Sequence, residues 1–425
     1  MGKAGAALDG TGPVRRRPLP APRRALALAA VFAAVGPGVL AMAGDNDAGG
    51  LLAYSATGAR FGTRFFLPAL VLLGLVTLVV QDMATRLAIG TGEGLPELVG
   101  RLGGRAWARV LAADLALVNT ATLVAELTGM AVGLAHFGLP LPLGILASLT
   151  AVTATLALGS YRSAERIGLS LVAINLLFLP LALTHLPPSG ALLPWPAART
   201  LARPGFALFA VGLAGNAIAP WMPFFQMDAV HAHGWTAPSD LKRARVDLAL
   251  GTAVQVLVAA AVLALSARAP WRGPFAPGPW LARLGSSTSP WVSDLFAAGL
   301  FDAGFVACLA VSYTSAWTVL RTWGGVGGAG AVPGRSRAAF ALFALGLAVA
   351  GLLVALPGAP LGLYAVATQA LSAVLMPPVL AVLWFLARRR RLVGALANGR
   401  GHDLVAALAL VLFVAASGAL LWGGS

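Results

Sequence analysis

Two acidic residues stand in the middle of the first long apolar segment of the chain. Asp45 and Asp47 belong to residues 43–50, which read AGDNDAGG in one-letter code. A carboxylate inside a bilayer is costly and marks a functional site by default. The glycines of the same run lower helix propensity, and unwound backbone at membrane depth is tolerated only where it lines a cavity or is buried in protein. We therefore expect an interrupted helix and a polar site at this point.

A second interruption is predicted at residues 215–223, which read GNAIAPWMP. Pro220 and Pro223 lack backbone N–H groups, and each disfavours helix at the residue before it. The two interruptions fall in the first and sixth apolar spans, which stand in corresponding places in two five-helix halves. Paired interruptions in an inverted repeat are the best sequence indication of a transporter's substrate site near the membrane midplane.

The residue types at the two interruptions favour a hard cation. An ionised carboxylate only accepts hydrogen bonds, and unwound backbone adds carbonyl oxygens, so together they offer the ligands that Mg²⁺ and Ca²⁺ prefer. No histidine or cysteine lies beside either interruption, which disfavours a soft transition-metal site. Met222 follows Pro220 and is interpreted as packing. Asp45 has two interpretations, a second ligand or a cap at the helix break.

Other polar residues within the spans are interpreted separately. Asp82 is followed by Arg86 four residues later, which indicates a structural ion pair on one helix. Glu126 is interpreted either as part of a proton or ion pathway or as a partnered interior carboxylate. Asp302 receives no assignment, and His231 is expected to be solvated at a helix end.

The elements that position these residues follow from the composition. Of 425 residues, 58% are hydrophobic and 11% are charged, whereas soluble chains have about 25% charged residues. This excludes a disordered protein and an ordinary cytosolic enzyme, and the single cysteine, Cys308, excludes a disulfide scaffold. Apolar runs that approach the ~20 residues of a membrane-spanning helix predict an all-α polytopic membrane protein. Eleven spans are predicted, at residues 27–55, 66–87, 110–134, 143–158, 167–183, 206–229, 246–265, 292–320, 338–356, 361–386 and 404–421.

The spans divide the chain into a tail and a transmembrane domain. Residues 1–24 are basic and proline-rich and are predicted to be a disordered cytoplasmic tail. A cleaved signal peptide is disfavoured, because the apolar run that follows is too long and more spans come after it. The transmembrane domain is predicted at 25–425, with a first repeat at 25–185, an inverted second repeat at 204–388 and an extra helix at 402–421.

Lysine and arginine residues set the expected orientation, because positively charged loops stay on the cytoplasmic side. With the N-terminus inside, most of the 30 Lys and Arg residues fall in cytoplasmic segments, including the run 388–391, and the C-terminus lies outside. The net charge of +15 is then explained by membrane orientation and contact with anionic lipid rather than by nucleic-acid binding.

Motifs along the chain resemble those of the natural resistance-associated macrophage protein (Nramp) family of divalent-metal transporters. The likeness rests on Gly36-Pro37 followed by Asp47-Ala48-Gly49-Gly50, on Gln81, Arg86-Leu87, Thr91-Gly92, Leu95 and Glu97-Leu98, on Ala125-Glu126 and Gly129, and on Gln369 with Pro377. Each motif is short, but their order and spacing are specific and cover nearly all of the chain after the tail. The resemblance implies a LeuT/APC-type inverted 5+5 repeat with broken helices 1 and 6, no enzyme activity and no resident cofactor.

The metal site that the resemblance implies departs from the family pattern. The family's Asp-Pro-Gly-Asn becomes Asp-Ala-Gly-Gly here, so Gly50 replaces a metal-binding Asn. Ala219 stands at the position of the family's metal-binding Met, while Asn216 adds a side-chain amide. Leu123 replaces an Asp thought to serve proton movement, and the histidines that follow the helix-6 proline in the family are absent.

These departures resemble the magnesium-transporter branch related to the family. Loss of the thioether removes a ligand that favours Mn²⁺ and Fe²⁺ over Mg²⁺, and small residues predict a roomier site, which suits the partly hydrated Mg²⁺ ion. We therefore expect a plasma-membrane importer of Mg²⁺, and also of Mn²⁺, without proton coupling. The expected metal-site residues are Asp47 as the primary ligand, Gly44 and Asn216 through oxygen atoms, Ala219, Gln369 in an occluded state, and Asp45, with Glu126 on the proton or ion pathway.

Three alternatives stay open from the sequence. The first is a proton-coupled Mn²⁺/Fe²⁺ Nramp importer. The second is a sodium-coupled carrier of organic solutes, which the two aspartates oppose because helix N-termini would have to hold a substrate carboxylate. The third is a membrane enzyme or a non-transporting receptor, for which the sequence offers no nucleophile–base pair and no soluble sensory domain. The expected partners are the divalent cation and the bilayer, not nucleic acid, and the sequence does not specify an oligomeric state.

Overall fold

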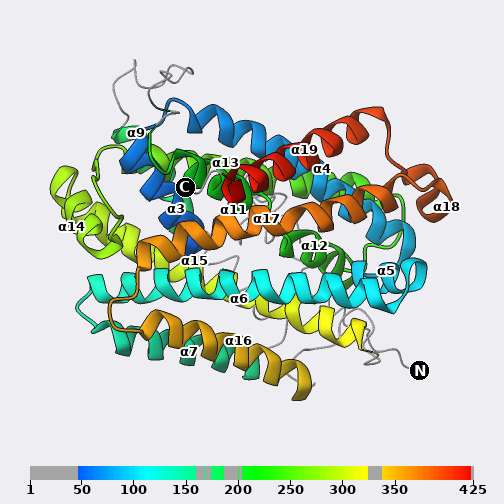
Figure 1. Ribbon diagram of the computed structural model, residues 1–425, viewed down its shortest axis with the longest axis horizontal. Coiled ribbons are helices and arrows are strands. Elements are labelled where there is room, and N and C mark those ends of the chain that lie inside the picture. The colour runs from blue at the N-terminus through cyan, green and yellow to red at the C-terminus, as the bar shows by residue number, and fades with distance from the viewer. Residues whose placement is uncertain are drawn as a thin grey trace, which may run out of the picture. The chain divides into compact units, whose positions relative to one another are not determined.

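The computed structural model describes residues 46–158, 174–185, 203–323 and 337–422, with the single residues 167 and 200. Every regular element in these ranges is a helix (Figure 1). The elements are α3 (Ala48–Phe61), α4 (Phe66–Thr91), α5 (Leu95–Gly103), α6 (Arg105–His136), α7 (Leu141–Leu158), α9 (Phe178–Thr184), α11 (Phe206–Ala217), α12 (Trp221–Ala232), α13 (Asp240–Ser266), α14 (Pro277–Ser287), α15 (Pro290–Thr322), α16 (Arg337–Ala355), α17 (Leu361–Ala387), α18 (Arg390–Val393), the short 3₁₀ helix η3 (Gly394–Leu396) and α19 (Arg400–Trp422).

The helices confirm the prediction of an all-α polytopic membrane protein. Seven helices in the described ranges are long and apolar enough to cross a membrane, and all seven coincide with predicted spans. Helices α3, α7, α9 and α16 coincide with the other four predictions, and the missing parts of the first and fifth spans lie outside the described ranges. The predicted tail 1–24 also lies outside them, as do Gly44 and Asp45. The repeat boundaries stay a prediction.

Both predicted interruptions are confirmed where the chain is described. Helix α3 begins at Ala48, directly after the non-helical Asn46 and Asp47. The sixth span is divided into α11, which ends at Ala217, and α12, which begins at Trp221. Pro220 explains the second division, because it cannot donate the backbone hydrogen bond that would continue the helix.

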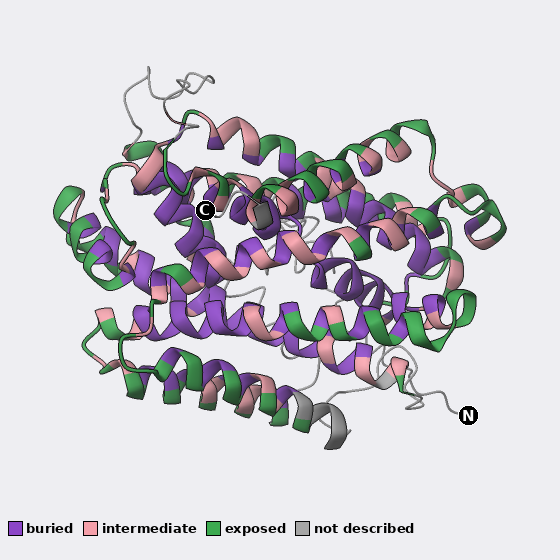
Figure 2. Ribbon diagram, in the orientation of Figure 1, coloured by how far each residue is buried: buried purple, intermediate pink, exposed green. Residues whose placement is uncertain are grey.

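Helix α6 lies along the middle of the bundle and packs against α15, α17, α7 and α16 (Figure 1). The two helices that follow the interruptions are deeply buried: α3 is buried from Ala48 to Ala59, and α12 from Trp221 to His231 (Figure 2). A helix that is apolar all round belongs in the interior of a membrane bundle. Both interruptions are therefore enclosed by other helices.

The outer helices present large apolar side chains outward. Leu345 and Leu352 on α16 and Leu404 and Val411 on α19 are exposed, as Figure 2 shows along the edges of α16 and α19. Such side chains would be a liability in water but match hydrocarbon. These surfaces are the expected contact with lipid.

Several short helices in the connections were not predicted. Helices α5, α14 and α18 lie between the spans. Helix α5 is amphipathic and is separated from α6 by Gly104, whose φ of +94° is a conformation that side chains disfavour. Such helices lack the long apolar run on which the span prediction depends.

The extra helix α19 is fastened to the bundle by a buried carboxylate on α4. Asp82 accepts a hydrogen bond from Arg86 Nε at 2.8 Å, which confirms the predicted ion pair on one helix. It also accepts from Arg245 Nε on α13 at 2.8 Å, and His402 Nε2 on α19 lies 3.0 Å from it. Arg86 in turn donates to Asn398 Oδ1 at 2.9 Å, in the segment that leads into α19.

The C-terminal end of α12 is fixed by two polar contacts. Asp228 forms a buried ion pair with Arg321 on α15, and His231 Nε2 lies 3.0 Å from the carbonyl oxygen of Ala88 on α4. His231 is buried, so its expected solvation at a helix end is wrong. The packing of α4 against α12 covers it, which the sequence around His231 alone does not show.

We predict that Asp82→Asn lowers the free energy of unfolding of the protein in detergent by about 3 kcal/mol, because it leaves the buried guanidinium of Arg86 without its counter-charge. Tryptophan fluorescence during heating would measure the change. Glu93→Gln is the matched control, since Glu93 forms an exposed ion pair with Arg101 and such pairs contribute about 1 kcal/mol or less. Equal effects of the two substitutions would contradict the anchoring role of Asp82.

Candidate metal site at the helix interruptions

Asp47 caps the start of α3 inside the bundle. Its side chain accepts a hydrogen bond from the backbone N–H of Gly50, and it is only 3% exposed. The first N–H groups of a helix have no partner within the helix and carry partial positive charge, so a carboxylate is favourable there. The local sequence thus fixes the predicted primary ligand at the interruption.

Gln369 and Glu126 approach the same turn from two other helices. Gln369 on α17 donates from Nε2 to Asp47 Oδ1 at 3.3 Å. Glu126 on α6 accepts from the backbone N–H of Ala48 at 2.8 Å, while its other oxygen has no hydrogen-bond partner. A Cβ atom on Gly49 would lie 2.7 Å from Gln369 Nε2 and 3.3 Å from Glu126 Oε1. A larger residue at this position would therefore displace Gln369 and crowd Glu126 at the helix start.

Asn216 at the end of α11 occupies the space beside Gly50. A Cβ atom on Gly50 would lie 2.5 Å from Asn216 Oδ1 and 2.9 Å from Asp47 Oδ1. Asn216 Nδ2 donates to the hydroxyl of Tyr54 at 2.5 Å, and both Oδ1 and Nδ2 of Asn216 face Gly50. Asn216 Oδ1 is buried without a hydrogen-bond partner. An unpaired buried acceptor next to a carboxylate is suited to a cation.

At position 50 itself, the small residue does not leave extra room. The loss of the Asn side chain at position 50 leaves no open space, because Asn216 fills it. The resemblance implies an amide on the first broken helix of the family, whereas this chain has glycine there and an amide at Asn216 on the sixth span. The packing shows that the two positions are adjacent.

The second interruption is held by side chains that the sequence analysis did not select. The carbonyl oxygen of Ala217 accepts hydrogen bonds from Thr77 Oγ1 at 2.7 Å and from Gln255 Nε2 at 3.1 Å. Ala219 is buried, and its N–H donates to the Met222 sulfur at 3.3 Å. A sulfur atom thus lies at the interruption, although Met222 was interpreted as packing.

The structure brings together four of the predicted site residues. Asp47, Asn216, Gln369 and Glu126 surround the first turn of α3, and all four are buried. Ala219 lies at the neighbouring interruption. The residues that sequence reasoning missed are Tyr54, Thr77 and Gln255. Their only sequence signal is that they are polar groups within apolar helices.

The ligands that the site offers are mainly neutral oxygens around one or two carboxylates. In the described ranges no three His, Cys, Asp or Glu side chains gather where they could hold a metal ion by themselves. A cation between the interruptions would therefore depend on amide oxygens as well as Asp47. Carboxylate and amide oxygens are the donor set of hard divalent cations.

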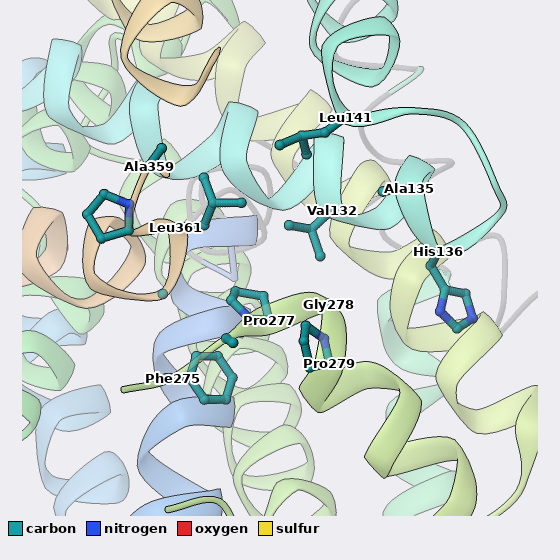
Figure 3. A pocket seen from close by; sticks show the side chains of 13 residues that line it. Val132, Ala135, His136, Leu141, Phe275, Pro277, Gly278, Pro279, Ala359 and Leu361 are labelled. Carbon is teal, nitrogen blue, oxygen red and sulfur yellow. The ribbon is translucent and has the colours of Figure 1, made fainter. Parts of the chain in front are cut away.

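A cavity of about 470 Å³ opens elsewhere, between the ends of α6, α14 and α17 (Figure 3). Figure 3 shows Phe275, Pro277 and Pro279 facing Val132 and Leu361 across it. The lining is mostly apolar, with His136 at one side. It offers no carboxylate, so it does not compete with Asp47 as the cation site.

Asp302 on α15 is a further carboxylate in the interior. It is 2% exposed, and neither of its oxygens has a hydrogen-bond partner. An ionised carboxylate in this environment is costly. Nothing else in the described ranges assigns Asp302 a role in the site.

A comparison with protein families shows to which family the chain belongs. The model of the natural resistance-associated macrophage protein-like family matches residues 38–423. The chain belongs to this Nramp family.

A divalent metal cation transporter, MntH, of Brucella suis biovar 1 (strain 1330) is 30% identical over 247 residues, which cover 55% of this chain and 53% of the relative. The MntH of Levilactobacillus brevis (strain ATCC 367) is 32% identical over 197 residues, covering 45% and 42%. The chain thus spans about half the length of the curated relatives it matches.

Solved structures show the same Nramp architecture. The manganese transporter of Eremococcus coleocola, in complex with an aromatic bis-isothiourea compound, aligns with a TM-score of 0.71 at 18% identity, over 92% of this chain and 86% of the other. Mhp1, a nucleobase-cation-symport-1 family transporter, aligns with a TM-score of 0.54 at 16% identity, over 90% and 92%. At these identities the likeness concerns the fold alone, and it supports the predicted LeuT-type architecture.

We predict that Gly50→Asn alone destabilises the protein, because its Cβ would lie 2.5 Å from Asn216 Oδ1, and overpacking typically costs about 1–3 kcal/mol. The double variant Gly50→Asn with Asn216→Gly is expected to recover most of the loss, since it returns the amide to the first helix. A double-mutant cycle on melting temperatures measures this coupling. Additive effects of the two changes would contradict the proposed exchange.

We predict that Asp302→Asn does not lower the melting temperature, because neither oxygen of the carboxyl group has a hydrogen-bond partner to lose. If the carboxylate is ionised, the substitution removes an unpaired buried charge and raises the melting temperature. Asp82→Asn is the contrasting variant, since Asp82 is paired. A drop for Asp302→Asn as large as for Asp82→Asn would mean that the Asp302 carboxylate has a cationic partner.

Proposed function

We propose that this Nramp chain is a secondary transporter that imports divalent metal cations across the plasma membrane. The observation that carries the proposal is the convergence of the Asp47 carboxylate and the unpaired Asn216 Oδ1 at the first turn of α3. The polar side chains that the described part of the chain brings to this turn, those of Asn216, Gln369 and Glu126, are not basic. Family membership argues for transport and against an enzyme, and the matched relatives carry the name divalent metal cation transporter.

We propose Mg²⁺ as the preferred cation, with Mn²⁺ also accepted. Asp47 would supply the charge, Asn216 Oδ1 an oxygen, and Gln369 its amide oxygen after a rotation that releases Nε2 from Asp47. Ala219 offers no side-chain ligand, so the site lacks the sulfur that would favour Mn²⁺ at that position. Gly44 and Asp45, which lie outside the described ranges, remain in the proposed ligand set.

The mechanism we propose is alternating access around the two interruptions, with one group of helices moving against the rest. Asp47, Asn216 and Gln369 are buried, so the proposed movement would have to open the site to each side of the membrane in turn. The positive-inside rule places the N-terminus and the 388–391 end in the cytoplasm and the C-terminus outside. The loss of the family's Asp at position 123 motivates transport without proton coupling.

One observation favours the alternative of a proton-coupled Mn²⁺/Fe²⁺ importer. The Met222 sulfur lies 3.3 Å from the Ala219 nitrogen, at the interruption itself. If Met222 turned its sulfur toward the cation, it would replace the family's thioether from three residues further along the chain. The unpaired oxygen of Glu126 would then serve the proton pathway.

We predict that the purified protein in liposomes admits Mg²⁺ without acidifying the lumen, and that Asp47→Ala abolishes entry because it removes the carboxylate that contacts both Gly50 and Gln369. A Mg²⁺-sensitive dye and a pH dye inside the liposomes give the two readouts. Asp302→Asn is the control, since it alters a carboxylate outside the site. Mn²⁺ entry with acidification and no Mg²⁺ entry would establish the alternative.

We predict that Ala219→Met shifts selectivity toward Mn²⁺ by about tenfold, the ratio given by 1.4 kcal/mol of added binding free energy. Met222→Leu is expected to leave selectivity unchanged, because its sulfur accepts a backbone N–H. Competition of Mg²⁺ against Mn²⁺ uptake measures both. A large loss of Mn²⁺ uptake in Met222→Leu would instead identify Met222 as the ligand.

A further inference from the structure

Helices α12 and α15 pack together along one row of large side chains that starts at the second interruption. Residues three or four apart on a helix share a face, and both helices carry such a series. The ring centroids of Phe225 and Trp317 lie 6.2 Å apart across the two helices, and Asp228 forms its ion pair with Arg321 one turn further along. We call this contact the seam, which consists of Trp221, Phe225 and Asp228 on α12 and Tyr313, Trp317 and Arg321 on α15.

The end of the seam furthest from the interruption is an enclosed charge cluster. The side chains of Asp228 and Arg321 are 3% and 4% exposed. Glu97 on α5 adds a second carboxylate, with Oε1 at 3.7 Å from Arg321 Nε, while its Oε2 accepts from the N–H of Gly94 at 2.9 Å. Arg321 thus joins α15 to both α12 and α5. Because removal of one partner of a buried ion pair is strongly destabilising, the pair holds α12 against α15.

Gly94 leaves the space that the Arg321 guanidinium occupies. A Cβ atom at position 94 would overlap Arg321 Nη1 and lie 3.1 Å from Asp228 Oδ1. The φ of −77° at Gly94 is open to any residue, so the backbone conformation does not require a glycine. The position of the guanidinium explains why a glycine stands there.

Helix α12 is separated from α11 but tied to α4. Residues 218–220 are non-helical, so α12 can change its tilt without carrying α11 along. Gln226 Nε2 donates to Thr85 Oγ1 on α4 at 3.0 Å, and His231 Nε2 lies 3.0 Å from the carbonyl oxygen of Ala88. By contrast, an ion pair ties α12 to α15. A separation at the seam would let water hydrate both ions, which offsets part of the lost attraction.

The seam lies between the second interruption and the arginine-rich end of the bundle. Trp221 is the first residue of α12, and the last turn of α12 contacts the end of α4 through His231. At the same end of α4, Gly90 lies against Val393 of α18, directly after the run 388–391. Figure 1 shows α5, α12 and α18 toward this end of the bundle.

We propose that the seam is the gate of the transport route at the arginine-rich end, which is the cytoplasmic end in the proposed orientation. The gate is shut while Phe225 contacts Trp317 and Asp228 contacts Arg321, and it opens when α12 swings away from α15 together with α4. Glu97 stays beside Arg321 in the open state, so the guanidinium keeps a counter-charge. The proposal rests on the proposed function, because it names the contact that alternating access breaks and re-forms.

The first test breaks the ion pair in the full-length protein. Asp228→Asn removes the charge that joins α12 to Arg321, while Glu97 keeps the buried guanidinium paired. In nanodiscs, hydrogen–deuterium exchange measured by mass spectrometry is expected to become about tenfold faster in α12, a typical size for a shifted conformational equilibrium, and to stay unchanged in α11. Glu93→Gln is the matched control, since it removes one acidic charge from the exposed ion pair with Arg101. Equal exchange of α12 in the two variants overturns the proposal.

A second pair of variants displaces the guanidinium without changing any charge. Gly94→Ala places a methyl group against Arg321, whereas Gly100→Ala, within α5, places it in ordinary contact 3.6 Å from the Ala108 Cβ atom. Faster exchange of α12 in Gly94→Ala alone supports the gate. Equal exchange in the two alanine variants overturns it, even if Asp228→Asn fails to fold.

Uptake measurements distinguish a gate from a frayed helix end and from a failure of the proposed function. Uptake of Mg²⁺ and Mn²⁺ into liposomes is expected to fall severalfold in Asp228→Asn, because the protein stays longer with this end open and returns its empty site more slowly. Faster exchange with unchanged uptake would mean that α12 only frays, and would overturn the gate. A wild-type protein that takes up neither ion, with faster α12 exchange in Asp228→Asn, would overturn the proposed function and leave the opening of the seam established.

Discussion

The structure depends on a carboxylate held inside a membrane bundle at the first turn of a helix. Asp47 is tolerable there because the backbone N–H of Gly50 and the amide of Gln369 donate to it. This requirement fixes the surroundings: α3 must begin at Ala48, glycines must follow, and α6, α11 and α17 must approach closely enough for their polar groups to reach the turn. Helices packed around small residues achieve such close approach in membranes. Because these two donors are neutral, neither of them compensates the negative charge of Asp47, which supports the proposal of a cation at this turn.

Much of this arrangement could be predicted from local sequence. Glycine, proline and aspartate within apolar runs have strong conformational consequences over a few residues, so the interruptions at 43–50 and 215–223 were placed well. The apolar runs located the long helices for the same reason. Gln369 was selected by resemblance to the family, and it lies beside Asp47, while its role as a metal ligand stays a prediction.

The parts that could not be predicted depend on contacts between distant residues. Gly50 and Asn216 are adjacent in space because α3 packs against α11. The sequence shows the residue at each position but not that the two positions are in contact. The burial of His231 and the Thr77 contact with the Ala217 carbonyl are of the same kind. Short amphipathic helices such as α5 were missed because a span search detects only long apolar runs.

Asn216 occupies the space that a side chain at position 50 would need, and this bears on how the chain could have evolved. A sequence with asparagine at both positions 50 and 216 would place two side chains in one volume, whereas a sequence with asparagine at neither would only lack an oxygen. A lineage that moved the amide from one broken helix to the other would therefore have passed through the sequence that lacks both.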